Sequence, residues 1–414
     1  MSVNFFKSFL IFNFLISIIP SAYSQKVLIL YDSVSINSTL GANCYLSDIT
    51  YFEKDHSLSA SFYQNQDSLS SIYQINRNHV ALNYKIDSKI LIAEKCDLFA
   101  TDSGYYLPKY FSEGLIFFDN STKQAKIVMG PTNFYYKDSK GKSHYKVSAI
   151  LDPYYKAGGS MVGDRLLMSA YRVSYMDYSR RMSWVSKKLK AYYNQPFLMF
   201  FKIQSEMGSK PFGRYPQHLI DSFANFRPNM KYYFCPEEDS KRIFVSFGAS
   251  PMIFVYNFSG NVIDSFPIKA THLNVAYLYI ASPDKSVLRF PDYYRLGLDS
   301  YGELKYSGGK LYRVYRKALP LEAFQYMKPD LAYNICRSPA EGNNWSKAER
   351  SKTKVLQEIN VQTKEHIEYN YPYTMDIFLG RNDQRNEYYF RKFEPDKLNT
   401  DRAVVYIYKP SFIK

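Results

Sequence analysis

Short stretches of alternating apolar and polar residues recur along the chain, and the clearest group spans residues 243–268. Three runs of β-branched and aromatic residues occur there, and the segments between them, 249–251 and 257–261, carry Pro, Gly and Asn. Alternation of this kind is typical of a strand with one buried face, whereas Pro, Gly and Asn favour tight reversals. Residues 243–268 therefore predict three antiparallel strands, which make up most of one β-propeller blade or one meander of another all-β fold.

Similar runs follow one another along the chain, and few segments have helical periodicity. Residues 115–118 and 125–129 repeat the same layout, because an Asp/Asn turn separates two apolar runs. Helix is expected for only a turn or two, within residues 346–358 and 218–223. The other predicted strands are residues 49–52, 58–63, 90–93, 166–173, 197–203, 276–280, 355–361 and 403–408, and a hairpin over 301–315 that turns at Gly308-Gly309.

The length of the chain fits a propeller in a single domain. Six long blades of roughly 60 residues would fill residues 25–414, and seven shorter blades also fit. No Pro- or Gly-rich linker divides the chain, and no exact repeat occurs at the ~40–45 residues of WD-type blades. The sequence thus predicts an all-β fold, a six-bladed β-propeller with seven blades as the alternative, in one domain over residues 25–414.

The first 24 residues have the layout of a cleavable signal peptide. Lys7 precedes an apolar stretch, residues 9–20, that is too short to span a bilayer. Ala22 and Ser24 fit a signal peptidase site, so the mature chain is expected to begin at Gln25; an uncleaved anchor is the alternative. No later window approaches the ~18 apolar residues of a membrane helix. The sequence therefore predicts an exported protein, periplasmic or extracellular, with no transmembrane segment.

Composition supports the all-β prediction and adds a basic charge. The chain has 41 Tyr and 30 Phe against 2 Trp, and these aromatic residues favour pleated surfaces. The formal net charge is +15, which removal of Lys7 with the signal peptide lowers to +14. In an exported protein this charge favours an anionic partner, such as an acidic glycan, an acidic protein or a membrane surface. Nucleic acid is not expected as a partner, because no nucleic-acid-binding motif is present.

The densest basic segment surrounds Trp184 and is the candidate ligand-binding site. In the functional interpretation, an aromatic ring stacks on a ligand whose anionic groups contact the basic side chains. The alternative is a solvated strand or short helix whose Trp packs inward. The predicted ligand-binding residues are Arg180, Arg181, Trp184, Lys187 and Lys188.

The sequence assigns no catalytic residue, metal site or cofactor. The six histidines are scattered without metal-ligand spacing, and neither a G-x-S-x-G elbow nor a phosphate-binding loop occurs. Four cysteines allow three disulfide connectivities. Local pairing would join Cys44 to Cys96 and Cys235 to Cys336, and buried free thiols are the alternative.

A resemblance to a known family adds a fold and a compartment. Residues 246–272, SFGASPMIFVYNFSGNVIDSFPIKATH, resemble the central signature of an uncharacterised family of exported Bacteroidetes proteins, a domain of unknown function that often occurs in lipoproteins. Similar features continue at 302–317, GELKYSGGKLYRVYRK, and around 388–393 and 404–408. The resemblance implies a six-bladed propeller and export. The family carries no established activity, so the resemblance assigns no catalytic residue. This chain lacks the lipobox cysteine of the lipoproteins.

Two functions from different classes fit these observations. The first is a non-enzymatic protein that binds a glycan, a peptide or a protein partner through the propeller's funnel or rim. The alternative is a carbohydrate-active hydrolase or lyase, which would need two carboxylates about 5–10 Å apart beside a deep pocket. A basic or Tyr-lined mouth would favour binding.

Overall fold

The fold is that of a computed structural model, in which nearly all of the regular secondary structure of the described residues is β-strand. In that part the one helix is α3 (Gln217–Ser222), within the stretch where a helical turn was expected. The signal segment, the basic segment at residues 180–190, Cys96, Cys336 and the predicted strands at 90–93 and 276–280 lie outside the described residues. The described residues are 26–37, 44–52, 56–64, 69–76, 79–86, 99–101, 103–108, 115–122, 124–129, 133–137, 143–148, 159–169, 171–172, 196–203, 207–222, 232–271, 299–317, 353–371, 377–392 and 402–412.

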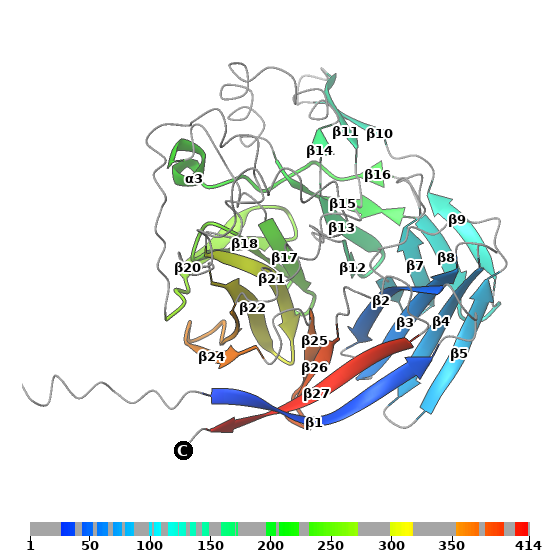
Figure 1. The fold of residues 1–414 in the computed structure, drawn as a ribbon. Helices are drawn as coiled ribbons and strands as arrows, with labels where there is room; N and C mark the ends of the chain where they lie inside the picture. The colour runs from blue at the N-terminus through cyan, green and yellow to red at the C-terminus, as the bar shows by residue number, and fades with distance from the viewer. Residues whose placement is uncertain are drawn as a thin grey trace, which may run out of the picture.

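Small antiparallel sheets follow one another in chain order around the middle of the molecule (Figure 1). Sheet I contains β2 (Cys44–Phe52), β3 (Ser57–Gln64), β4 (Leu69–Asn76) and β5 (His79–Ile86). Sheet II contains β6 (Phe99–Thr101), β7 (Gly104–Pro108), β8 (Leu115–Asp119) and β9 (Ala125–Met129). Sheet III contains β12 (Ser160–Val162), β13 (Arg165–Ser169), β15 (Leu198–Lys202) and β16 (Met207–Gly208). Sheet IV contains β17 (Tyr232–Glu237), β18 (Arg242–Phe247), β19 (Met252–Asn257) and β20 (Val262–Pro267).

The remaining large sheet has eight strands in two halves. Sheet V contains β21 (Ser300–Ser307), β22 (Lys310–Arg316), β23 (Lys354–Ile359) and β24 (His366–Asn370). Sheet VI contains β25 (Ile377–Asn382), β26 (Glu387–Arg391), β27 (Arg402–Phe412) and the N-terminal strand β1 (Lys26–Asn37). Among the described strands, backbone pairing joins the two halves only where β1 pairs in parallel with β24, at Lys26 and Val27. A separate three-stranded sheet holds β10 (Asn133–Lys137), β11 (Ser143–Ser148) and β14 (Tyr171–Arg172).

The first strands of the successive sheets lie next to one another. β17 contacts β21, β21 contacts β25, and β25 contacts β2; β12 contacts both β6 and β17. The two ends of the chain meet in sheet VI, because β1 pairs antiparallel with β27 along its whole length. The first and last parts of the chain are therefore joined by backbone hydrogen bonds.

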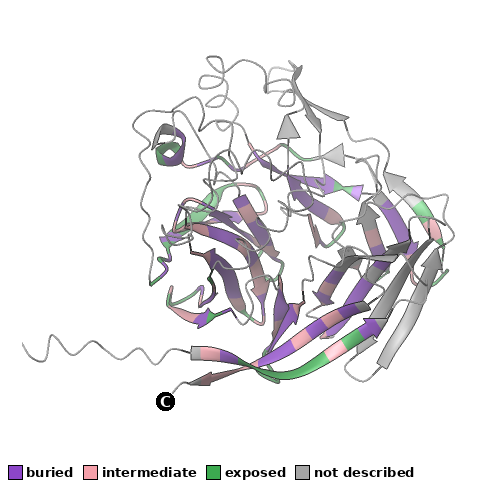
Figure 2. Ribbon diagram, viewed as in Figure 1, coloured by how far each residue is buried: buried purple, intermediate pink, exposed green. Residues whose placement is uncertain are grey.

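Hydrophobic side chains fill the spaces between neighbouring sheets, and Figure 2 shows runs of buried residues along their strands. Ile243, Val245 and Phe247 of β18 share one cluster with residues of sheet III. Phe244, the alternate residue, lies in a second cluster with Leu304 and other residues of sheet V. The alternation predicted for residues 243–247 is therefore confirmed, and both faces of β18 are buried because a sheet packs on each side.

A buried arginine joins sheets IV and V. Arg313 of β22 is fully buried, and its guanidinium lies 3.8 Å from the centre of the Tyr301 ring. Burial lowers the pKa of Arg313 to about 9, since no solvent stabilises the charge there. The guanidinium donates hydrogen bonds to Gln357 Oε1 (2.9 Å), Ser246 Oγ (3.4 Å), and the backbone oxygens of Pro251 (3.1 Å) and Ile268.

Two predicted elements need correction. The run at residues 166–173 is not one strand. β13 belongs to sheet III, whereas β14 pairs with β11 in the three-stranded sheet. The helical turn expected within residues 346–358 is wrong over its last part, since Lys354–Ile359 is the strand β23. Backbone pairing with β22 on one side and β24 on the other outweighs the helical propensity of this segment.

Candidate functional site

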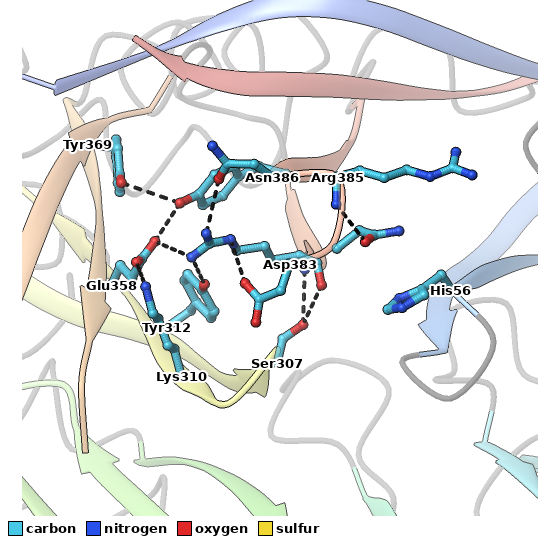
Figure 3. Close-up of polar contacts among 12 residues, drawn as sticks. His56, Ser307, Lys310, Tyr312, Glu358, Tyr369, Asp383, Arg385 and Asn386 are labelled. Atoms are coloured by element: carbon cyan, nitrogen blue, oxygen red, sulfur yellow. Dashed lines mark hydrogen bonds and ion pairs between the residues drawn. The ribbon is translucent and has the colours of Figure 1, made fainter. Parts of the chain in front are cut away.

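A charged cluster lies where sheets V and VI meet, close to sheet I (Figure 3). Its centre is the buried carboxylate of Glu358, on β23. Glu358 Oε1 accepts a hydrogen bond from Lys310 Nζ, on the neighbouring strand β22. Glu358 Oε2 accepts one from the Tyr388 hydroxyl (2.5 Å) and forms an ion pair with Arg381 Nη1 (3.0 Å). Strand pairing places Glu358 and Lys310 on one face of sheet V, whereas Tyr388 and Arg381 reach it from sheet VI.

These contacts fix the protonation of the cluster. Burial alone would raise the pKa of Glu358, but the hydrogen bonds from Lys310 and Tyr388 and the charge of Arg381 hold it below its ordinary value. Burial, together with the negative charge of Glu358, raises the pKa of Tyr388. At neutral pH the carboxylate is therefore ionised and the phenol is protonated.

Arg381 connects this buried carboxylate to the turn between β25 and β26. Its Nη1 donates to the Tyr312 hydroxyl (3.0 Å) and its Nη2 to Asn386 Oδ1 (3.0 Å), while its Nε pairs with Asp383 Oδ1 (2.9 Å). Both Asp383 and Asn386 belong to the turn, residues 383–386. The guanidinium therefore holds the turn against sheet V. Its planar fork of donors suits several acceptors at once.

The β21–β22 turn packs against the same place because it is made of glycine. Gly308 and Gly309 have φ angles of 55° and 73°, and a Cβ on Gly308 would lie 2.3 Å from Asp383 Oδ2. Ser307, just before the turn, donates from its Oγ to the Arg381 carbonyl (3.2 Å) and accepts from the Arg381 N–H (3.0 Å). Glycine is required here both for the left-handed backbone and for the close approach of a carboxylate.

Sheet I adds a histidine to the edge of the cluster. The Tyr51 hydroxyl, on β2, donates to the Arg381 carbonyl (3.2 Å) and lies 2.7 Å from His56 Nδ1. Either group can donate in the bond between Tyr51 and His56, because the imidazole has two tautomers. The Tyr51 ring also stacks on Tyr389 of β26, with centroids 5.0 Å apart.

The surface above the buried charges is polar and carries an arginine. Asp383, Arg385 and Asn386 are exposed and His56 is half-buried. In Figure 3 the Arg385 side chain extends away from the cluster, while its backbone N–H donates to Asn382 Oδ1 (3.2 Å). In the part of the chain that the structure describes, the Arg385 guanidinium makes no ion pair. We call Arg385, Asn386 and His56 the rim.

The buried charged residues are paired with one another's charges, whereas the rim residues can bind a ligand. Glu358 and Asp383 are both bound to Arg381, so neither offers a carboxylate without a cation beside it. Arg385 and Asn386 can donate hydrogen bonds to an anionic or hydroxyl-rich group. Among the described residues no group of three or more His, Cys, Asp and Glu side chains could hold a metal ion. No helix within those residues is long and apolar enough to cross a membrane.

The predicted ligand-binding residues all lie outside the described residues, so their role stays a prediction. They are Arg180, Arg181, Trp184, Lys187 and Lys188. The cluster itself was not predicted. One signal was present, because Glu358 is the one charged residue in the strand predicted at residues 355–361, and a charge inside a buried strand needs a partner.

Comparison with known proteins gives a likeness in fold. No family model matches the chain, and no curated protein matches its sequence. The chain is similar to the crystal structure of a member of the DUF4221 family from Bacteroides vulgatus, with a TM-score of 0.57 and 10% identity over 94% of this chain and 99% of that one. At this identity the likeness shows a common fold and nothing about activity.

Two further structures are more distant. One is a protein of unknown function from Bacteroides thetaiotaomicron, with a TM-score of 0.40 and 9% identity over 93% of this chain and 76% of that one. The other is an oligogalacturonate lyase in complex with manganese, with a TM-score of 0.40 and 11% identity over 90% of this chain and 81% of that one. Their TM-scores are too low to support any argument about this chain.

Proposed function

We propose that sheets I to VI are the six blades of one β-propeller, a single domain formed by residues 25–414 after export. The contacts between the first strands of successive sheets support this arrangement, because in a propeller those strands surround the central axis. The pairing of β1 with β27 supports ring closure, since it places the N-terminal strand in the last blade. The likeness in fold to the DUF4221 member agrees with the family resemblance of residues 246–272.

We propose further that this exported propeller binds an anionic glycan and does not transform it. The observation that carries the proposal is the division of the charged cluster. Lys310 and Arg381 both bond to Glu358, whereas Arg385 and Asn386 of the rim are exposed. The turn that Arg381 holds carries an exposed guanidinium and an exposed amide, and each can donate hydrogen bonds to a carboxylate or sulfate group.

The same geometry argues against the glycosidase alternative at this place. A catalytic acid needs a raised pKa and access to the glycosidic oxygen. Glu358 has a lowered pKa, is buried, and has Lys310, Tyr388 and Arg381 as partners. The basic segment with Arg180, Arg181, Trp184, Lys187 and Lys188 is proposed as a second contact region for the same ligand, because its charges have the same sign as the rim arginine.

The test is a glycan array probed with the mature protein, followed by calorimetric titration of any acidic glycan it retains. Arg385→Ala should weaken binding about 10-fold, which corresponds to ~1.4 kcal/mol. Arg214→Ala is the matched control, since Arg214 is equally an exposed arginine but lies before α3. Neutralising Arg180, Arg181, Lys187 and Lys188 together tests the basic segment separately.

Three results would contradict the proposal. The first is an array on which the protein binds no acidic glycan. The second is equal affinity of Arg385→Ala and Arg214→Ala for the glycan. The third is a shortened or unsaturated product when the bound glycan is incubated with the protein, which would favour the hydrolase or lyase.

A further inference from the structure

The outer strand of sheet VI carries an exposed apolar surface. Ile29, Leu30 and Tyr31 of β1 are 54%, 51% and 55% exposed, and Figure 2 shows exposed residues along the middle of this strand. Among the described residues the other exposed large apolar side chains are Val262 and Ile263, on β20. Three consecutive exposed apolar residues on an outer strand indicate a surface that binds a membrane or another molecule.

A bulge in β1 contributes to this exposure at Tyr31. Leu30 pairs with Tyr408 and Asp32 pairs with Ile407, so Tyr31 is an extra residue with no opposite residue on β27. The bulge interrupts the alternation that would bury every second side chain. β24 covers the other edge of β1 only at Lys26 and Val27, and no other described strand pairs with that edge beyond Val27.

The bulge also decides which kind of occupant fits. A bulge and a charged side chain on an edge strand hinder the addition of another strand, and Asp32 follows the bulge directly. Binding to a lipid membrane does not require a regular strand edge. Aliphatic and tyrosine side chains insert at the depth of the lipid headgroups, and basic side chains pair with anionic headgroups there.

Charge complementarity points to the same occupant. Lys409 of β27 places its ammonium 3.8 Å from the centre of the Tyr31 ring, and the ammonium also lies 3.9 Å from the buried Glu387 carboxylate. The mature chain would carry a net charge of +14. We infer that the surface formed by Ile29, Leu30 and Tyr31 docks this protein on an anionic phospholipid membrane. This inference is independent of glycan binding at the rim.

The test is flotation of the mature protein with lipid vesicles, either phosphatidylcholine alone or phosphatidylcholine with about 30% phosphatidylglycerol. The wild type should float with the anionic vesicles and not with the neutral ones. Replacing Ile29, Leu30 and Tyr31 by Ser should lower the bound fraction about 10-fold. Tyr31→Ser alone should give a smaller loss and serves if the triple variant fails to fold by circular dichroism.

Two controls separate this surface from others. Val262→Ser with Ile263→Ser removes an equally exposed aliphatic pair (55% and 53%) next to Asp264, and this variant should float like the wild type. Arg385→Ala should also float like the wild type, so that failure of glycan binding and failure of docking are distinguishable. Equal flotation of the folded triple or single β1 variants and the wild type would overturn the inference, as would no flotation of the wild type. Light scattering that shows a wild-type dimer and a monomeric triple variant would assign the surface to a second copy.

Discussion

Replacing Val245 by Asp puts a carboxyl group between sheets III and IV. Val245 is 0% exposed, pairs with Phe234 and Phe254 on the neighbouring strands, and packs in the cluster shared with sheet III. Loss of a fully buried Val side chain costs about 1.5–3 kcal/mol. Burying a carboxyl group without a partner adds about 2 kcal/mol or more, whether it stays charged or takes up a proton. We therefore expect the free energy of unfolding to fall by about 4–6 kcal/mol, a large part of the ~5–15 kcal/mol typical of folded proteins.

The assay is urea denaturation at pH 7, followed by far-ultraviolet circular dichroism. Val262→Asp is the matched control, because it makes the same change in the same sheet at a position that is 55% exposed, and it should alter stability by less than about 0.5 kcal/mol. The cost of Val245→Asp should shrink as the pH is lowered, because a protonated carboxyl group is cheaper to bury. Equal urea midpoints for the two variants would refute the packing of β18 between two sheets.

Three further predictions concern buried charges and export. Glu358→Gln should lower stability by about 3 kcal/mol at pH 7, because Lys310 loses its carboxylate and Arg381 keeps only that of Asp383. The lowered pKa of Glu358 means that its stabilisation is present above the unfolded pKa of about 4.3 and is lost as the pH falls further. Urea midpoints at pH 7 and pH 3 should therefore differ less in the variant than in the wild type, and an equal difference would contradict this. Arg313→Met should cost about 2–5 kcal/mol, because the carbonyls of Pro251 and Ile268 lose their donor, and an unchanged thermal midpoint would exclude a stabilising role. N-terminal sequencing of the exported protein should give Gln25, and a chain that begins at Met1 would refute the cleavage.

The sequence predicted strands well where local signals are strong. Alternation identified β18, β19 and β20, and the Gly308-Gly309 pair located the turn between β21 and β22. These elements depend on neighbouring residues in the chain, so a short window contains the information. β17 was missed, because a proline and an acidic pair at residues 236–238 interrupt its apolar pattern.

The site could not be predicted, because its contacts join distant parts of the chain. Glu358 and Tyr388 are separated by 30 residues, and Tyr51 and Arg381 by 330. No local pattern specifies such pairs, which depend on how sheets I, V and VI pack. The role of β1 was likewise missed, since its partner β27 is at the opposite end of the chain. The basic segment was noticed because its charges are adjacent in sequence, and that adjacency alone does not show that they bind a ligand.

Ligand binding at the rim can be measured by one titration. The acidic glycan retained by the array is titrated into the wild type and into Arg385→Ala, at about 50 mM and about 500 mM salt, since screening shortens the Debye length over this range. We predict that the wild type loses most of its affinity for the glycan at the higher salt concentration. We expect Arg385→Ala to bind the glycan more weakly than the wild type and to lose less affinity when salt is added. Binding that is equally tight in both proteins and at both salt concentrations would contradict this prediction.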